Sequence, residues 1–143
     1  MTQPIGKNIY QRILAIMAEV EYVQKENKKV NNQYSYVAHD AVACKLHPQL
    51  VKHGVVFVPD FIETKQDGNR TEVVMNAKFI NADNPQDFIE FKSFGYGIDT
   101  GDKGPGKAMS YAAKYALLKM FLLETGDDPE QDAETKHKPK PIS

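Results

Sequence analysis

The fold is decided by residues 71–98, which read TEVVMNAKFINADNPQDFIEFKSFGYGI. Residues 87–98 alternate with a period of two, which is typical of a strand with two different faces. The two sets are Phe88, Glu90, Lys92, Phe94 and Tyr96 against Ile89, Phe91, Ser93, Gly95 and Gly97. A second strand is predicted at 71–82, and the segment 83–86, DNPQ, contains turn residues. The stretch therefore predicts two antiparallel strands joined by a short turn.

A third strand is predicted just before this pair, at residues 55–65, which are rich in Val, Phe and Ile. Asp67, Gly68 and Asn69 follow it and are typical of a tight hairpin turn. Pro59 lies within this strand and predicts an edge position or a bulge, because proline has no N–H to donate. The three segments together predict an antiparallel meander.

Two helices are predicted before the meander. Residues 5–22 carry apolar side chains at helical spacing, with polar ones such as Arg12 elsewhere on the wheel; the apolar set is Ile9, Ile13, Met17 and Val20. The polar segment 25–32 predicts a loop. A second helix is predicted from His39 or Asp40 to His53, with an apolar stripe of Val42, Leu46 and Leu50. Asp40 suits its first turn, Gly54 suits the position after its end, and Pro48 predicts a kink or a break near His47.

A last helix is predicted from Pro105 or Lys107 to about Leu123, after the glycine-rich loop 99–106. The predicted order is α-α-β-β-β-α. This order indicates an α+β fold in which helices pack on one face of a three-stranded antiparallel meander.

Composition indicates one globular domain with a tail. The chain has 143 residues, 41% of them hydrophobic and 26% charged, which excludes wholesale disorder. Residues 1–123 carry 15 Lys and Arg against 13 Asp and Glu, whereas residues 124–143 carry three against six. We therefore expect a mildly basic domain at 1–125 and a flexible tail at 126–143, acidic and then basic. The tail is either simply solvated or competes with a ligand for the basic face.

Compartment and cofactors are constrained by what the sequence lacks. No apolar run approaches the ~18–20 residues that span a bilayer, so no membrane association is expected. Cys44 is the only cysteine, which favours a cytoplasmic location, and we expect it to be buried rather than nucleophilic. The four histidines show no metal-ligand spacing, and Asp99 and Asp102 suit turns or caps better than a metal site. Neither a metal nor a cofactor is expected.

Residues 95–118, GYGIDTGDKGPGKAMSYAAKYALL, carry the functional argument. Residues 101–107 match the G-x-x-x-x-G-K pattern of a phosphate-binding P-loop between a strand and a helix. Ala108 follows, however, where that motif needs Ser or Thr for magnesium, and Pro105 removes one backbone N–H. P-loop domains also use a parallel sheet. A nucleotide-binding enzyme is therefore the alternative rather than the leading interpretation, and a small interaction module is a third.

The same segment suits a single-stranded polynucleotide better. Lys107, Tyr111 and Lys114 share one helical face, and Lys103 precedes them beside the helix N-terminus, where anions are favoured. Lysines can bind phosphates and tyrosine rings can stack on bases. Alternatively, the lysines are ordinary surface residues and the buried stripe of the helix consists of Tyr111, Tyr115, Leu118 and Leu122.

Three blocks of the sequence resemble the essential recombination function (ERF) family of single-strand annealing proteins. They are YSYVAHDAV at 34–42 with LHPQLVKHGV at 46–55, GDKGPGKAMSYAAKYALL at 101–118, and GDDPEQD at 126–132. The second block is the most specific, because aspartate-lysine, the Gly-Lys-Ala turn and a Tyr/Lys/Tyr helix rarely occur together. Many relatives have an arginine where this chain has Lys114, which keeps the charge but not the planar fork.

The resemblance implies a phage or prophage recombination protein in the bacterial cytoplasm, with the β-β-β-α single-strand annealing fold. Such a protein is not an enzyme: it binds single-stranded DNA and anneals complementary strands without ATP, as a ring or filament of subunits. DNA contacts are implied for Lys103, Lys107, Tyr111 and Lys114, and a host or phage single-stranded-DNA-binding protein is a candidate partner. Tyr34 and Tyr36 either pack under the sheet or stack on bases.

Overall fold

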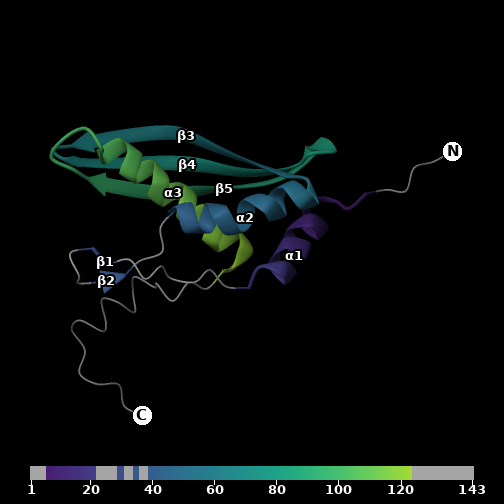
Figure 1. Ribbon diagram of the computed structural model, residues 1–143. Coiled ribbons are helices and arrows are strands. Elements are labelled where there is room, and N and C mark those ends of the chain that lie inside the picture. Colours follow the sequence, from purple (N-terminus) through teal and green to yellow (C-terminus); the bar gives the residue numbers. More distant parts are fainter. Residues whose placement is uncertain (1–5, 22–28, 31–33, 36–38, 124–143) are drawn as a thin grey trace, which may run out of the picture.

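A three-stranded antiparallel sheet forms the centre of the computed structural model, which describes residues 6–21, 29–30, 34–35 and 39–123 (Figure 1). Its strands are β3 (Val55–Asp67), β4 (Arg70–Asn81) and β5 (Asn84–Ile98), in the order β3-β4-β5. Every neighbouring pair is antiparallel. The predicted meander is therefore confirmed.

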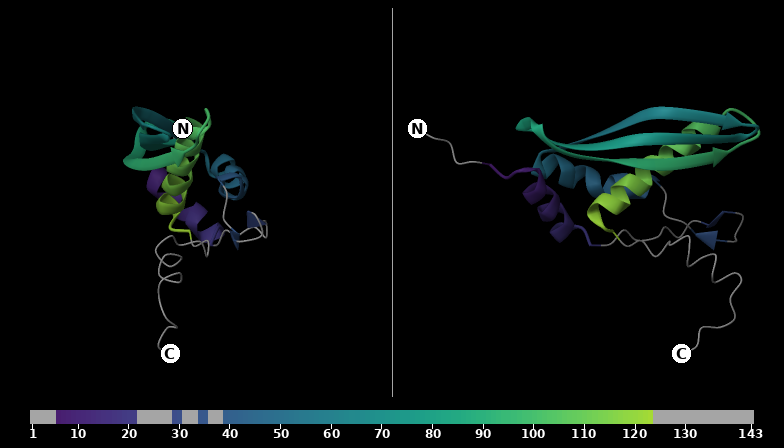
Figure 2. Two further views of the ribbon diagram at one scale, coloured as in Figure 1. Left: turned by 90° about the vertical axis from the view of Figure 1, so that its left-hand side faces the viewer. Right: turned by 180° about the vertical axis from the view of Figure 1, so that it is seen from behind.

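Three helices cover one face of this sheet and leave the other face open (Figure 2). They are α1 (Ile9–Glu19), α2 (His39–His53) and α3 (Gly104–Phe121). The predicted α+β fold, in the order α-α-β-β-β-α, is confirmed. The structure adds a two-stranded ladder, β1 (Lys29–Val30) with β2 (Tyr34–Ser35), which begins inside the segment predicted as a loop. Strand β1 has only two residues, so its sequence is too short to show the alternation that predicts a strand.

The core lies between the sheet and the helices. On β4 every second residue is buried and faces the helices: Thr71, Val73, Met75, Ala77, Phe79 and Asn81. Phe79 is fully buried, and its ring centroid lies 4.9 Å from that of Phe57, 6.0 Å from Phe91 and 5.7 Å from Phe121. Burying a side chain of this size contributes about 1.5–3 kcal/mol to stability. This aromatic cluster therefore joins all three strands to the last helix.

The turns differ from the prediction by a few residues. The turn between β4 and β5 is Ala82–Asp83 alone, so β5 begins at Asn84 and includes Pro85. The strand tolerates this proline because it lies at the start of an edge strand. Pro59 is also on an edge strand, β3, as predicted, and the register shifts nearby, between Phe61 and Glu63. Gly68 in the β3–β4 turn has a φ of 60°, which favours glycine.

Most of what was predicted for the second helix is confirmed. Val42 and Leu46 are buried, and Gly54, just after its end, has a φ of 68°. Of the predicted kink or break, the break is wrong, because α2 continues through Pro48 to His53, and the kink stays a prediction. The prediction that Cys44 is buried is also wrong, since its side chain is exposed. A single small residue does not show which face of a helix is buried. Here the buried face contains Val42 and Leu46, and Cys44 lies outside it.

The first helix begins later than predicted. Asn8 caps α1: its side chain accepts from the backbone N–H of Gln11, whose side chain accepts from the N–H of Asn8. The apolar stripe is Ile9, Ile13, Ile16 and Val20, with Met17 partly buried. This capping box fixes the start of the helix at Ile9 rather than at residue 5.

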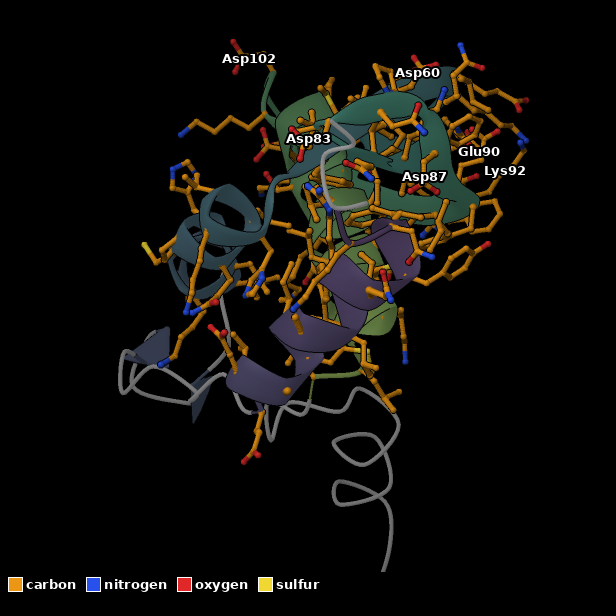
Figure 3. The ribbon with its side chains drawn as sticks, turned by 90° about the vertical axis from the view of Figure 1, so that its right-hand side faces the viewer. Asp60, Asp83, Asp87, Glu90, Lys92 and Asp102 are labelled. Carbon is orange, nitrogen blue, oxygen red and sulfur yellow. The ribbon has the colours of Figure 1, made fainter. Side chains whose placement is uncertain are left out.

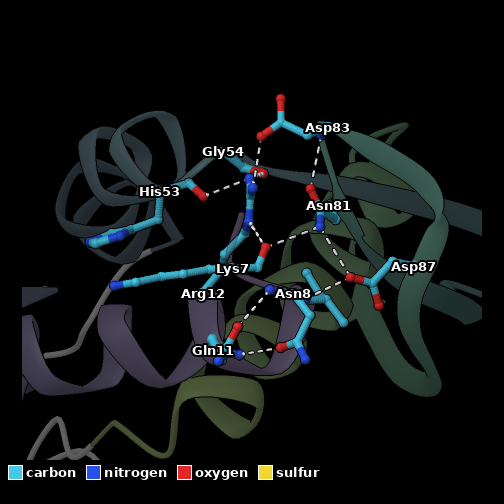
Figure 4. A network of polar contacts seen from close by, with 10 residues as sticks. Lys7, Asn8, Gln11, Arg12, His53, Gly54, Asn81, Asp83 and Asp87 are labelled. Atoms are coloured by element: carbon cyan, nitrogen blue, oxygen red, sulfur yellow. Dashed lines mark hydrogen bonds and ion pairs between the residues drawn. The ribbon is translucent and has the colours of Figure 1, made fainter. Parts of the chain in front are cut away.

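Arg12 is buried, although its polar side chain predicts a surface position (Figure 4). Its Nε donates to the carbonyl oxygen of Lys7 at 2.7 Å, and its Nη1 donates to those of His53 and Gly54 at 3.2 and 3.0 Å. Its Nη2 donates to Asp83 Oδ2 at 2.7 Å. This side chain joins the start of α1, the end of α2 and the β4–β5 turn.

Some predictions lie outside the described residues. They concern the tail at 126–143, Tyr36, and the side chains of Tyr34, His39 and Asp40. Within the described ranges, no helix is long and apolar enough to cross a membrane.

Candidate functional site

The site is built where α3 lies directly against the edge strand β5. A Cβ atom added to Gly97 would lie 2.6 Å from the Cβ of Lys107 and 2.8 Å from the amide nitrogen of Ala108. A Cβ on Gly95 would lie 2.6 Å from the amide nitrogen of Ala112. These distances are shorter than van der Waals contact, so only glycine allows this approach. The two glycines therefore set how closely the α3 side chains meet β5.

The loop between β5 and α3 is organised around Asp99. Its Oδ2 accepts from the backbone N–H of Gly101 at 2.9 Å and of Lys103 at 3.3 Å. Its Oδ1 accepts from Lys107 Nζ at 3.0 Å, and this ammonium also donates to the carbonyl oxygen of Ile98 at 3.2 Å. The hydrogen bond from Lys107, and then those from the two backbone N–H groups, hold the pKa of the Asp99 carboxyl below its ordinary value. The predicted turn role of Asp99 agrees with this geometry.

This loop differs from a phosphate-binding P-loop. Asp99 Oδ2 already accepts from the backbone N–H groups of Gly101 and Lys103, two of the donors that a nucleotide phosphate would need. The preceding strand belongs to an antiparallel sheet, and Ala108, at the position of the magnesium-binding hydroxyl, is fully buried. The arrangement gives no support to the alternative of a nucleotide-binding enzyme.

The first two predicted DNA-contact lysines lie at the start of α3. Lys103 is the N-cap residue and is exposed, and its side chain makes no capping hydrogen bond. Lys107 lies one turn further, with 48% of its side chain exposed. Both cations are therefore accessible beside the N-terminus of an 18-residue helix, where the helix dipole favours anions.

The other two predicted residues differ from each other in exposure. Tyr111 is 46% exposed, whereas Lys114 is only 8% exposed. The ammonium of Lys114 lies 4.9 Å from the ring centroid of Tyr111 and 4.8 Å from that of Tyr115, and the two rings are stacked with centroids 5.7 Å apart. The structure thus brings Tyr111 and Lys114 together, with the buried lysine holding its ammonium near two rings, whereas the more exposed Lys107 contacts Asp99.

The alternative buried stripe for α3 is wrong at two of its four positions. Tyr111 is nearly half exposed and Leu122 is 75% exposed, whereas Leu118 is buried. The helix instead buries small residues against β5, because the backbones lie so close: Gly104, Ala108, Ala112, Ala113 and Ala116, followed by Leu117, Leu118 and Phe121. Tyr111 and Leu122 lie outside this buried set.

Two residues of the sheet extend this cluster and were not identified from the sequence. Tyr96 on β5 stacks with Tyr111 at a centroid distance of 6.5 Å and an interplanar angle of 10°. The guanidinium carbon of Arg70 on β4 lies 3.9 Å from the ring centroid of Tyr96. The available signal was the alternation Gly95-Tyr96-Gly97, which directs the ring away from the helix side while the glycines face α3. We call Arg70, Tyr96, Tyr111, Lys114 and Tyr115 the ring row.

The open face of the sheet has a different character. Two of its cations lie close to carboxylates: Arg70 Nε is 2.7 Å from Glu72 and Lys78 Nζ is 4.0 Å from Glu90. Figure 3 shows Asp60, Glu90 and Lys92 projecting from the sheet on the side away from the helices. Exposed apolar residues lie between these charges: Val56, Val58, Phe88, Phe94 and Ile98. At the start of α3, Lys103 and Lys107 are exposed as well, and these two cations lie next to the rings of the site.

Metal-binding groups are not gathered anywhere in the described part of the chain: no three His, Cys, Asp or Glu side chains could hold an ion together. His53 lies 3.1 Å from Glu19, which also accepts from Lys52 at 3.2 Å. These contacts, that of Lys52 first, lower the pKa of Glu19. His53 therefore takes part in a contact between α1 and α2.

Exposed cations next to half-exposed rings suit a polyanion that carries flat aromatic groups. A search of curated proteins found no match to this sequence. The family model described as the ERF superfamily matches residues 9–142. This range covers the helices, the sheet and all the site residues, and it agrees with the resemblance noted from the sequence. The chain belongs to the ERF superfamily.

Proposed function

We propose that this protein binds single-stranded DNA and anneals complementary strands without ATP, in the homologous recombination of a phage or prophage. Membership of the ERF superfamily suggests recombination and single-strand annealing. The observation that carries the proposal for this chain is the order of groups along α3: Lys103 and Lys107 exposed at its start, then the half-exposed ring of Tyr111.

Each group has a distinct part in this proposal. Lys103 and Lys107 bind phosphates of the strand, and Lys107 exchanges its contact with Asp99 for a phosphate oxygen. Tyr111 offers its ring to a base, and Lys114 keeps a positive charge next to that ring. The bases then keep their pairing edges accessible, so a second strand can be tested for complementarity. Annealing of this kind requires no catalytic residue, metal or cofactor.

A single subunit binds weakly, because it offers few phosphate contacts and each is sensitive to salt. We propose that subunits assemble into a ring or filament, which repeats the site and raises the overall affinity. A host or phage single-stranded-DNA-binding protein would supply the strands in the cytoplasm of the host bacterium.

The class of function is tested by titrating the full chain with fluorescent oligothymidine at two salt concentrations and then sizing the complex. We expect tight binding that weakens as salt rises, and a particle much larger than one subunit. Binding that does not depend on salt would contradict the proposal. So would magnesium-dependent ATP hydrolysis, which the nucleotide-binding alternative requires.

The site is tested with the double variant Lys103→Ala/Lys107→Ala. We expect annealing of complementary oligonucleotides to be abolished while the circular dichroism spectrum is unchanged, because both side chains are exposed. The matched control is Lys45→Ala/Lys92→Ala, which changes the net charge equally at two exposed positions, on α2 and on the open face. Equal annealing by the two double variants would reject the site.

A further inference from the structure

We propose that Tyr96 and Arg70 form a base-stacking site that carries the DNA strand from α3 around the edge of β5. This inference rests on the proposed function and adds two residues from the sheet to its site. The ligand is a nucleobase of single-stranded DNA, of any sequence, because every base has a flat face that can stack.

The ring row runs from α3 over β5 to Arg70 on β4. Tyr115, Tyr111 and Tyr96 follow one another with centroid distances of 5.7 and 6.5 Å and interplanar angles of 15° and 10°. Because these rings are nearly parallel, a base that stacks at the row adopts their common orientation. Arg70 ends the row 3.9 Å above Tyr96, and a guanidinium plane can itself stack on a base.

The row is accessible to a ligand. Tyr96 is 51% exposed and Tyr111 is 46% exposed, so neither ring is needed to fill the core. The ordinary reason for aromatic side chains to gather is burial. Here Gly95 and Gly97 face α3, and the ring between them points the other way, so that it meets Tyr111 around the strand edge.

The position of the row favours a base over other occupants. Lys107 lies one helical turn before Tyr111, and it contacts the carbonyl oxygen of Ile98, two residues after Tyr96. A phosphate at Lys107 therefore places the attached nucleoside beside these two rings. A second copy of this chain is the other candidate occupant, and the experiment distinguishes the two.

The same strand offers a matched control at its other end. Lys78 Nζ lies 4.0 Å from the ring centroid of Phe88, and Phe88 is 39% exposed on the open face. This pair repeats the cation-over-ring arrangement of Arg70 and Tyr96 but lies far along β5 from Lys107. Substitutions at Phe88 therefore control for the loss of an exposed ring from the sheet.

The first experiment uses a tryptophan reporter, because the chain contains no tryptophan. Tyr96→Trp is titrated with oligothymidine and with an abasic oligonucleotide of the same length, which has phosphates but no bases. We expect the thymidine strand to quench the fluorescence and the abasic strand to bind without quenching. Phe88→Trp should not be quenched by either strand. Equal quenching of both reporters, or no quenching of Tyr96→Trp by a bound strand, would overturn the inference.

The second experiment measures affinity. Tyr96→Ala should weaken the binding of oligothymidine at least about fivefold, which corresponds to ~1 kcal/mol, and leave the binding of the abasic strand unchanged. Tyr96→Phe should retain the affinity, as should Phe88→Ala. If both strands bind Tyr96→Ala as they bind the original chain, the stacking site is rejected and the proposed function survives. If neither strand binds the original chain, the proposed function itself fails. A change in particle size without any difference between the strands would assign Tyr96 to a contact between subunits and reject the stacking site.

Discussion

Two cation–aspartate pairs lie at opposite ends of β5 and differ in burial. At the start of the strand, Arg12 Nη2 lies 2.7 Å from Asp83 Oδ2, and the arginine side chain is 9% exposed. After its end, Lys107 Nζ lies 3.0 Å from Asp99 Oδ1, and the lysine side chain is 48% exposed. The two distances are similar, so distance does not decide what each pair does.

Burial and the remaining partners do decide it. Arg12 also donates to three backbone carbonyl groups, so it has no capacity to exchange its partners without disrupting the fold. Lys107 has one carbonyl besides Asp99 and is open to solvent, so a phosphate can replace the carboxylate. We infer that the first pair stabilises the fold and the second holds a DNA-binding lysine in position. Four predictions test this contrast.

The largest effect is expected for Arg12→Ala. Removing the guanidinium leaves the carbonyl groups of Lys7, His53 and Gly54 with fewer partners in a partly buried region. We expect the free energy of unfolding to fall by about 2–4 kcal/mol, measured by urea denaturation.

Lys107→Ala is the matched control for this prediction. It removes a cation from the exposed pair, and we expect a change within about 0.5 kcal/mol. Equal losses in Arg12→Ala and Lys107→Ala would remove the distinction between the two ends of β5.

A smaller effect is expected for Asp83→Asn. The asparagine oxygen can still accept from Arg12, but the opposite charge is lost from a carboxylate whose side chain is 80% exposed. We expect a loss of about 0.5–1 kcal/mol in the same denaturation experiment. A loss as large as that of Arg12→Ala would show that the carboxylate, rather than the backbone carbonyl groups, carries the contribution of Arg12.

The contrast also explains how much of the molecule could be predicted from sequence. The meander was predictable because its signals are local: alternation along residues 87–98, and the turn residues at 67–69. The burial of Arg12 was not, because three of its four partners lie 41, 42 and 71 residues away in the sequence. No periodic pattern contains that information.

The candidate site also has a part that the sequence predicts and a part that depends on contacts in the folded structure. Lys107 and Tyr111 were named from helical spacing and Lys103 from its place before the helix, and the structure places the three in order along the start of α3. The meeting of Tyr96 with Tyr111 depends on how closely α3 approaches Gly95 and Gly97, which only the packed structure reveals. The position of the Lys114 ammonium beside the rings of Tyr111 and Tyr115 is likewise visible only in the packed structure.

The third prediction concerns affinity for DNA. Asp99→Asn keeps an oxygen that can accept from the backbone N–H groups of Gly101 and Lys103, but removes the charge that competes with phosphate for Lys107. We expect affinity for oligothymidine to rise about two- to fivefold at low salt, with little change in the urea midpoint.

The control is Asp102→Asn, which makes the same change in net charge in the same loop. Figure 3 shows Asp102 projecting from the end of the molecule, and its side chain is exposed. We expect a smaller rise in affinity for this variant. Equal rises would indicate a general effect of net charge rather than competition at Lys107.

The smallest effect is expected in the titration of Asp99 itself. Because Lys107 and two N–H groups lower its pKa, charged Asp99 stabilises the fold above the ordinary pKa of the carboxyl. That stabilisation is lost as the pH falls through the lowered value. Lys107→Ala removes the largest cause of this lowering, so the pKa of Asp99 should rise toward its ordinary value. The change is measured by NMR of the carboxyl carbon as a function of pH. Glu19, whose pKa is lowered by Lys52 and His53, should not move.

The same resonance tests the exchange of partners that separates the two ends of the sheet. When single-stranded DNA binds, Lys107 leaves Asp99 for a phosphate and brings a negative charge close to the carboxylate, and both changes raise the pKa of Asp99. An Asp99 pKa that is identical with and without bound DNA would show that Lys107 keeps its carboxylate, and would make this pair as structural as that of Arg12.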